Sequence, residues 1–328
     1  MSGINKLSCT TAIGGNTGIG SCAFDPDKIT GALIVPLTFK VTYSESTEKY
    51  TWDATEYDTA IEAFQASTLA VASKRAYPIW KFQLITDNSE TGTVTTSGYG
   101  DKSYVKEGKY DWTFQLSESF GSVCFLKRLR MFNDLKNYGV VFFDDKNRAI
   151  GTLTTDSDGI APLTLEFFHA EPFKIADGSN RTIYSVRFAL ADPSELNDYP
   201  AFIELESIAT GIKGIIDVTL KSASAATAGH AFVKLETTQG GVDIYDSFST
   251  ELADVDAWIL TKAGVSKTIT GVTKSDSLKG WNIASAETGD CVIALAPPDE
   301  LAASGIGVGG GAEYGYEGSN TLAVTLPT

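Results

Sequence analysis

The chain has little of the side-chain chemistry on which most enzymes depend. In 328 residues it contains two histidines, His169 and His230. It also contains four cysteines, none of them in a Cys-x-x-Cys pair: Cys9, Cys22, Cys124 and Cys291. A P-loop and a His-Glu-x-x-His motif are both absent. Acid–base catalysis, metal binding and nucleophile activation draw heavily on these residues. We therefore expect a binding or building-block protein and not an enzyme, with no catalytic, cofactor or metal site.

Other absences bear on where the protein folds. Residues 1–6 lack the basic and apolar regions of a signal peptide. No apolar run reaches the ~18 residues of a membrane-spanning helix. Four cysteines in so long a chain do not suggest a disulfide scaffold. We expect a protein made in a reducing cytoplasm, with no membrane partner.

The chain is acidic, with a formal net charge of −15. An acidic surface repels the phosphate backbone, so ordinary nucleic-acid binding is disfavoured. The same repulsion would suit a conduit through which DNA slides without sticking. Acidity also keeps many proteins in solution, and both interpretations stay open.

The composition predicts a β-dominated chain of two domains. A length of 328 residues corresponds to roughly two domains, and 43% hydrophobic residues suffice for real cores. The 31 glycines, with abundant Thr and Ser, indicate many turns and short strands. We predict an extended arm over 1–30, an α+β, sheet-dominated domain over 31–208 with two helices, and an all-β domain over 209–328.

The first domain combines two predicted helices with many strands. Residues 53–74 predict the clearest helix, with Asp53 or Thr55 as its N-cap. A second helix is predicted over 117–135, where we expect Cys124 to pack as a small hydrophobic residue. Strands are predicted over 32–43, 79–86, 92–97, 103–116, 138–143, 149–155, 163–168, 182–190 and 201–206.

Two short features refine this reading. Pro36 falls inside the first predicted strand, which favours an edge strand or a bulge. Asp144–Asn147 reads as a turn between two strands and therefore predicts a hairpin.

Residues 209–328 have the pattern of a β-sandwich. Turn residues recur at intervals of roughly 8–12 residues, the spacing of such a fold. The predicted strands are 214–221, 230–237, 254–261, 267–272, 280–283, 290–296 and 321–326. We expect Trp258 and Trp281 in the core, and a flexible glycine-rich loop over 305–318.

Residues 14–20 read Gly-Gly-Asn-Thr-Gly-Ile-Gly and match the glycine spacing of short-chain dehydrogenases. Pro26 ends any following helix after about one turn. The Tyr-x-x-x-Lys partner, Tyr77–Lys81, lies in a proline-containing, strand-like stretch. The context favours a flexible glycine arm, and a nucleotide-binding oxidoreductase is the enzymatic alternative.

Other candidate sites have simpler interpretations. Residues 156–159 resemble the start of a calcium loop, but the glycine stands at the fourth position and not at the sixth, which favours a turn. We interpret His169 and His230 as structural. Aromatic residues crowd one region, where exposed rings would bind sugars or a partner. Strand alternation favours their packing into core and subunit contacts instead: Tyr77, Trp80, Tyr99, Tyr104, Tyr110, Trp112 and Phe114.

Four segments of the first domain carry a family resemblance. They are TSGYG at 96–100, VKEGKYDWTF at 105–114, VCFLK at 123–127 and YGVVFFDD at 138–145. Over residues 75–200 the chain resembles virion proteins of tailed phages and prophages of Bacteroidetes-type bacteria. The order of strand, helix and strand hairpin is similar to that of the tail-tube family. In that family a β-sandwich or small barrel with a flanking helix forms rings, and a C-terminal immunoglobulin-like domain is a common appendage. The resemblance brings no active-site residues.

The resemblance implies a structural subunit of the virion, assembled in the host cytoplasm. The tail tube would consist of stacked homo-oligomeric rings, with an acidic lumen through which DNA passes without sequence-specific binding. Edge strands are templates for pairing between subunits, and residues 1–30 and 97–108 can order on assembly. The N-terminal arm and early helix depart from a minimal tube protein. They leave open a neck, connector or capsid-associated role among other virion proteins. A carbohydrate-binding or adhesive surface protein is the alternative of another class.

Overall fold

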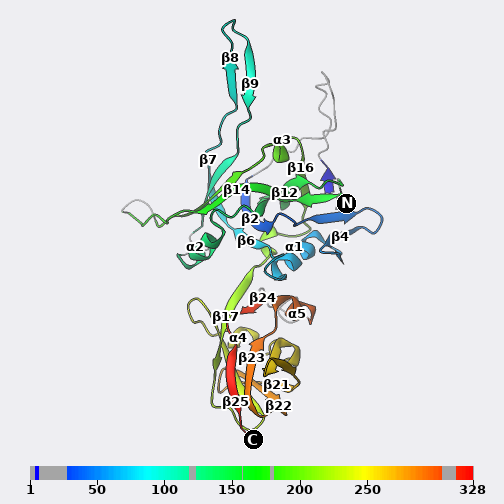
Figure 1. Cartoon of the computed structure of the whole chain (residues 1–328), viewed down its shortest axis with the longest axis vertical. Helices are drawn as coiled ribbons and strands as arrows, with labels where there is room; N and C mark the ends of the chain where they lie inside the picture. The colour runs from blue at the N-terminus through cyan, green and yellow to red at the C-terminus, as the bar shows by residue number, and fades with distance from the viewer. Residues whose placement is uncertain are drawn as a thin grey trace. The chain divides into compact units, whose positions relative to one another are not determined.

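The computed structural model of the chain describes residues 4–6, 28–117, 123–156, 158–177, 181–304 and 315–327. The chain divides into two compact units, of which the first comprises Met1–Thr68 and Ser73–Ile212, and the second Leu69–Ala72 and Lys213–Thr328 (Figure 1). Both consist mainly of strands, which confirms the predicted β-dominated fold. No helix in the described ranges is long and apolar enough to cross a membrane.

The elements of the first unit include many short strands and few helices. The strands are β1 (Ile4–Lys6), β2 (Ile29–Pro36), β3 (Val41–Ser44), β4 (Lys49–Trp52), β5 (Thr55–Tyr57), β6 (Tyr77–Trp80), β7 (Phe82–Asp87), β8 (Thr93–Thr96), β9 (Lys102–Lys106), β10 (Asp111–Leu116), β11 (Tyr138–Asp144), β12 (Arg148–Leu153), β13 (Gly159–Ala161), β14 (Leu163–Ala170), β15 (Tyr184–Leu190) and β16 (Pro200–Glu204). The helical elements are α1 (Ala60–Leu69), α2 (Val123–Leu129), η1 (Arg130–Phe132), α3 (Ser194–Asn197) and η2 (Ala209–Gly211).

Strands β2 and β11 form the centre of the first unit, because both of their faces are buried. They pair antiparallel along their whole length. Alternate residues point into two separate cores, so that Phe142 lies in one and Phe143 in the other. Strands β14, β15, β10 and β7 enclose the first core with α2, and α1 covers the second core together with β3 and β4. The nearly continuous apolar runs of β2 and β11 are typical of strands buried on both faces.

Helix α1 is shorter than the helix predicted over 53–74. It begins with a capping box, in which Thr59 Oγ1 accepts a hydrogen bond from the Glu62 N–H at 3.3 Å and Glu62 Oε2 accepts one from the Thr59 N–H at 3.2 Å. The predicted caps were wrong, because Thr55 lies in β5 and Asp53 in the turn before it. Pairing of β5 with β4 removes these residues from the helix.

The second predicted helix, over 117–135, is also shorter. Its described part is α2 followed by η1, and residues 118–122 lie outside the described ranges. Leu126 and Leu129 are buried, whereas Cys124 is exposed, so the prediction that it packs was wrong. Residues two positions apart on a helix point in nearly opposite directions, and the leucines take the inner face.

Two further predictions concern the start of the chain. Within the predicted arm over 1–30, β1 pairs antiparallel with β16, and residues 14–20 lie outside the described ranges. Pro36 is the last residue of β2, which is an internal strand between β11 and β6. Of the two predicted alternatives, an edge strand or a bulge, the edge position was therefore wrong, and the register shift between β2 and β11 lies at the other end of β2. Proline is accommodated because the strand ends there.

The second unit is a β-sandwich of two sheets around one core. The first sheet has the order β21-β22-β18-β17-β24 and the second β20-β19-β23-β25. Trp258 and Trp281 are both buried in this core, as predicted. Part of the loop predicted over 305–318 is a strand, because β24 pairs parallel with β17; residues 305–314 lie outside the described ranges. The immunoglobulin-like topology stays a prediction.

The elements of the second unit have the following bounds. They are β17 (Ile215–Ser222), β18 (His230–Thr237), α4 (Tyr245–Phe248), η3 (Val255–Ala257), β19 (Trp258–Lys262), β20 (Val265–Lys267), β21 (Ile269–Ser275), β22 (Gly280–Ser285), β23 (Gly289–Leu295), α5 (Pro298–Ala303), β24 (Gly315–Gly318) and β25 (Leu322–Leu326).

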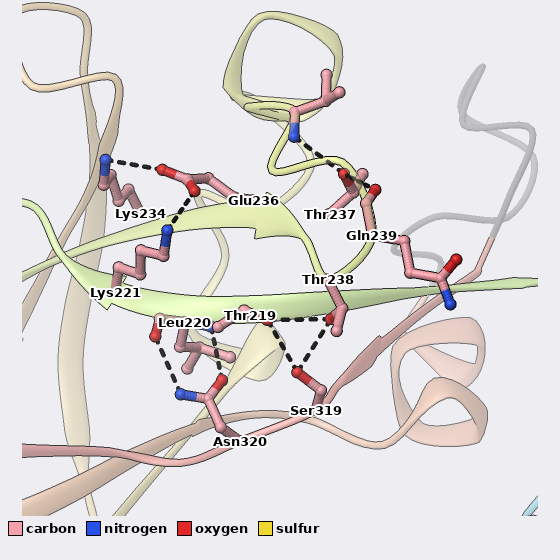
Figure 2. A network of polar contacts seen from close by, with 11 residues as sticks. Thr219, Leu220, Lys221, Lys234, Glu236, Thr237, Thr238, Gln239, Ser319 and Asn320 are labelled. Carbon is pink, nitrogen blue, oxygen red and sulfur yellow. Dashed lines mark hydrogen bonds and ion pairs between the residues drawn. The ribbon is translucent and has the colours of Figure 1, made fainter. Parts of the chain in front are cut away.

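Side chains extend the pairing of β17 beyond the end of β24 (Figure 2). Asn320 Oδ1 accepts a hydrogen bond from the Leu220 N–H at 2.7 Å, and Asn320 Nδ2 donates one to the Leu220 carbonyl at 3.0 Å. Beside them the hydroxyls of Thr219, Thr238 and Ser319 lie 3.0 Å from one another. The asparagine side chain thus replaces one residue of a neighbouring strand.

Candidate assembly surface

A long β-hairpin projects from the sheet of the first unit. Strand β7 pairs antiparallel with β10, and β8 pairs with β9 further along the same two chain segments. In Figure 1, β8 and β9 stand away from the other strands of this unit. The turn at the tip is closed by the Gly100 N–H, which donates to the Ser97 carbonyl at 2.9 Å. We call residues 83–110 the arm. It is a different segment from the N-terminal arm predicted over residues 1–30.

The side chains of the arm are exposed over almost its whole length. Between residues 83 and 107, every side chain whose burial is described is exposed except the half-buried Ser89. Four aliphatic residues there are between 48% and 61% exposed, and one tyrosine is 98% exposed: Leu84, Ile85, Val94, Val105 and Tyr99. Large apolar side chains thus face solvent.

Neither face of the arm is covered by residues that the structure describes. Leu84 and Ile85 are both exposed, although consecutive residues of a strand point to opposite faces. Within the described part of the chain, β7 pairs only with β10, so its other edge presents unpaired backbone groups. A two-stranded ribbon on its own is at best marginally stable in water. These features are typical of a segment that binds another protein surface.

The backbone at the base of the arm is closely packed. The Asn88 N–H donates to the Asp111 carbonyl at 2.8 Å, and the Glu90 N–H donates to the Lys109 carbonyl at 2.9 Å. These bonds connect the ladder of β7 and β10 with that of β8 and β9. A Cβ atom at Gly108 would lie 1.8 Å from the Glu90 carbonyl oxygen. Glycine is therefore required at position 108, where the two chain segments lie closest to each other.

Side chains from the body of the unit also hold this base. Asn197 of α3 donates to Glu107 Oε1 at 2.6 Å and accepts a hydrogen bond from the Tyr110 hydroxyl. Burial raises the pKa of Tyr110, and the charge of Glu107 adds to the shift. Lys109 Nζ lies 2.8 Å from Glu166 Oε2 on β14. The arm is thus exposed at its tip and anchored at its base.

Charge on the arm differs from that of the whole chain. The arm contains four acidic and three basic residues, Asp87, Glu90, Asp101, Glu107, Lys102, Lys106 and Lys109. Its formal charge is therefore −1, against −15 for the chain. Lys106 and Glu90 form an ion pair across the arm at 3.1 Å. Two arms can approach with little of the repulsion that acts between acidic surfaces.

An ion pair stiffens the sheet next to the arm. Arg187 Nε donates to Asp111 Oδ1 at 2.8 Å, and the second oxygen of Asp111 accepts from the same guanidinium. This hydrogen bonding raises the pKa of Arg187. The guanidinium also stacks 5.3 Å from the centre of the Phe167 ring. The bidentate geometry holds β10 and β15 together where the arm leaves the sheet.

The structure separates the aromatic residues that the sequence grouped. Trp80 and Phe114 are buried, as strand alternation predicts. Tyr99 stands instead at the tip of the arm, in contact with solvent. The sequence predicted a loop over residues 97–108 that orders on assembly, whereas the exposed hairpin begins at residue 83. Alternation in β7 and β10 predicted strands but not that both faces would stay uncovered.

The other candidate residues do not form a common site. His169 lies on β14 opposite Arg187, and His230 lies in the other unit with Nδ1 3.1 Å from Asn282 Oδ1. Asp158 accepts a hydrogen bond from Thr154 Oγ1 at 2.7 Å in the turn between β12 and β13. Among the described residues, no three His, Cys, Asp or Glu side chains gather as metal ligands would.

Comparison with known proteins adds no family. No protein-family model matches the chain, and no curated protein matches it.

Proposed function

We propose that this protein is a structural subunit of a phage particle that forms the tail tube as stacked homo-oligomeric rings. In this proposal residues 31–208 form the ring, residues 209–328 are an immunoglobulin-like appendage, and the acidic lumen lets DNA pass without sequence-specific binding. The partners are further copies of the chain and other virion proteins. The observation that carries the proposal is the arm, with its apolar faces and open edge. The resemblance of residues 75–200 to phage virion proteins supports the same role.

The arm suits assembly energetically as well as geometrically. Its four aliphatic side chains are about half exposed, and covering each would contribute on the order of 1 kcal/mol. Backbone pairing along the β7 edge would add a defined register between subunits. In a ring every subunit makes the same contact with its neighbour. The modest binding energy of one arm is therefore repeated at every subunit interface of the ring.

Negative-stain electron microscopy over a concentration series tests the proposal. We expect rings or tubes with a central hole. The double variant Val94→Thr, Val105→Thr keeps the β-branched shape and removes apolar surface, and we expect it to need a higher concentration to assemble. Val265→Thr is the matched control, because Val265 is 60% exposed on β20 of the other unit. Wild-type protein that stays monomeric at every concentration would contradict the assembly role.

A neck or capsid-associated role predicts a different image. Tubes of stacked rings favour the tail tube, whereas single rings that never stack favour a connector. Unchanged assembly of the Val94→Thr, Val105→Thr variant would show that the arm is not the contact.

A further inference from the structure

The helical segment α2–η1 of the first unit presents apolar side chains to solvent. Its inner side packs three residues into the core, Leu126, Leu129 and Phe132. Three other apolar residues of this segment and the turn after it are between 39% and 61% exposed: Val123, Met131 and Leu135. Leu37 is 42% exposed at the end of the same segment, where its N–H donates to the Asn137 carbonyl at 3.2 Å. Exposed apolar side chains that gather in one place mark an interaction surface.

Cations lie among these apolar residues. Residues 123–137 contain four basic residues and one acidic residue, so their formal charge is +3 in a chain of −15. Three of the cations are exposed, and their side chains form no hydrogen bond or ion pair with a residue that the structure describes: Lys127, Arg130 and Lys136. We call the exposed side of residues 123–137 the basic face. Arginine and methionine, which it contains, are enriched in protein interfaces.

Another surface of the same unit is acidic. Residues 45–62 contain six acidic residues and one basic residue, so their formal charge is −5. Three of the six have partners within the unit: Asp53, Asp58 and Glu62. The other three are exposed, and their side chains have no such partner in the described ranges: Glu45, Glu48 and Glu56. We call the β3–β4 turn and the β4–β5 hairpin, which carry these three, the acidic edge.

The basic face and the acidic edge lie on opposite sides of the first unit. Helix α2 encloses the core that contains Phe142, whereas β3 and β4 enclose the core that contains Phe143. The paired strands β2 and β11 separate the two cores. Figure 1 shows α2 and β4 on opposite sides of this unit. The two surfaces therefore cannot meet within one unit, but they can meet head to tail between two copies.

We infer that the basic face binds the acidic edge of a second copy of the chain. Three cations without partners then meet three carboxylates without partners, and the apolar side chains beside the cations are withdrawn from water. Such a contact uses a different patch on each copy, so it continues from copy to copy and closes into a ring where the rotation between copies allows it. The inference rests on the proposed function, for which it names a second contact besides the arm.

Double-stranded DNA is the other acidic partner to consider. Interfaces between proteins and DNA are more polar than those between proteins. The exposed Val123, Met131 and Leu135 side chains would face phosphates there without apolar contacts. The mixture of cations and apolar side chains therefore favours a protein surface.

Two charge-reversal variants test the contact. Lys127→Glu, Arg130→Glu reverses the basic face, and Glu48→Lys, Glu56→Lys reverses the acidic edge. In each variant alone like charges meet, and we expect assembly to need an about tenfold higher concentration, because two exposed ion pairs and the repulsion that replaces them contribute about that factor. Mixed in equal amounts, the two variants should assemble as the wild type does, because unlike charges then meet at every contact between them. Sedimentation velocity at low salt measures assembly, and high salt should weaken that of the wild type.

A control variant separates this contact from the effect of net charge. Lys28→Glu, Lys274→Glu changes the net charge as much as the first variant does, at two exposed lysines outside both surfaces, and should assemble as the wild type does. Assembly of either reversal variant at the wild-type concentration would overturn the inference. So would an equal defect in the control, or a mixture that does not assemble although thermal unfolding shows that both variants fold.

The wild type and the variants together separate this inference from the proposed function. Rings that form equally well in all variants would overturn the inference alone. Dimers or open chains that are lost in each variant and restored in the mixture would support the contact and contradict the ring. Wild-type protein that stays monomeric at every concentration would overturn both. Unchanged assembly, with a DNA duplex that the wild type retards in a gel and Lys127→Glu, Arg130→Glu does not, would assign the basic face to DNA instead.

Discussion

Asp144 and Arg148 form a buried ion pair that closes the hairpin between β11 and β12. Asp144 Oδ1 accepts hydrogen bonds from the backbone N–H groups of Lys146 at 3.0 Å and Arg148 at 2.9 Å. Asp144 Oδ2 accepts from Arg148 Nε at 2.7 Å and lies 2.6 Å from its terminal guanidinium nitrogen. The aspartate side chain is 0% exposed, and the guanidinium lies over the Phe202 ring. One carboxylate therefore supports both the turn and the centre of the first unit.

Removing the charge of Asp144 should destabilise this unit. Asp144→Asn removes the buried carboxylate charge that pairs with Arg148, and we expect a loss of about 3 kcal/mol in the free energy of unfolding. Urea unfolding followed by circular dichroism measures it. Asp145→Asn is the control, because Asp145 is exposed in the same turn. Equal stability of the two variants would contradict a structural role for the pair.

Gly108→Ala should displace the base of the arm. The added Cβ would overlap the Glu90 carbonyl, so one chain segment has to move and the bond from the Glu90 N–H to the Lys109 carbonyl should break. Hydrogen–deuterium exchange should then be faster at the Glu90 amide. Gly98→Ala is the control, since a Cβ at Gly98 meets no atom within 4 Å. Unchanged protection at Glu90 would mean that the backbone absorbs the methyl group elsewhere.

The second unit should lose stability in alkaline solution. Burial, together with a hydrogen bond of 2.7 Å to Asp276, raises the pKa of Tyr245 from its ordinary 10.0 to about 12. The folded unit therefore keeps a proton that the unfolded chain releases, and the stabilising effect is complete below pH 10 and declines as the pH rises towards 12. Thermal unfolding between these pH values measures the decline.

Two substitutions test the assignment to Tyr245. In Tyr245→Phe the dependence of stability on pH should be flatter, because the titrating group is gone. Tyr199→Phe should behave as the wild type, because Tyr199 is exposed. An equally steep decline in Tyr245→Phe would assign the effect to other groups.

Asn320→Asp should weaken the edge of β17. The aspartate still accepts from the Leu220 N–H, but its second oxygen faces the Leu220 carbonyl without a proton between them. We expect a loss of about 1–3 kcal/mol, the cost of a half-buried acceptor left without its donor. Ser319→Ala removes a neighbouring exposed hydroxyl and should cost much less. Denaturant unfolding measures the free energy of unfolding of both variants. Equal losses in the two would contradict the prediction, because Asn320 would then stabilise the fold no more than the exposed Ser319 hydroxyl does.

Hydrogen bonds within the same network also predict a response to acid. Hydrogen bonds from Lys221 and then from Lys234 lower the pKa of the Glu236 carboxyl below its ordinary 4.5. The stabilising contribution is therefore present above pH 4.5 and is lost as the pH falls through the lowered value. In Glu236→Gln the free energy of unfolding should fall less steeply as the pH is lowered below 4.5. Since these side chains lie near the surface, the effect should shrink in high salt.

Local patterns predicted the elements whose signals lie within a few residues. The strand expected over 230–237 is β18 with the same bounds, and the turn at Asp144–Asn147 joins two strands as expected. The start of α1 was also readable, because Thr59 and Glu62 have the spacing of a capping box. The wider helical periodicity of residues 53–74 concealed it. Residues 55–57 pair with β4 in a hairpin, and helical periodicity does not show that strand pairing competes for the same residues.

The sequence by itself determined the β-dominated character, most strand positions, the buried tryptophans of the second unit and the scarcity of catalytic side chains. These follow from residue composition and short-range pattern. Only the tertiary structure decided which strands are covered. Alternation assigns side chains to two faces, but the partners that bury a face come from distant segments, so it did not reveal the uncovered arm at 83–110.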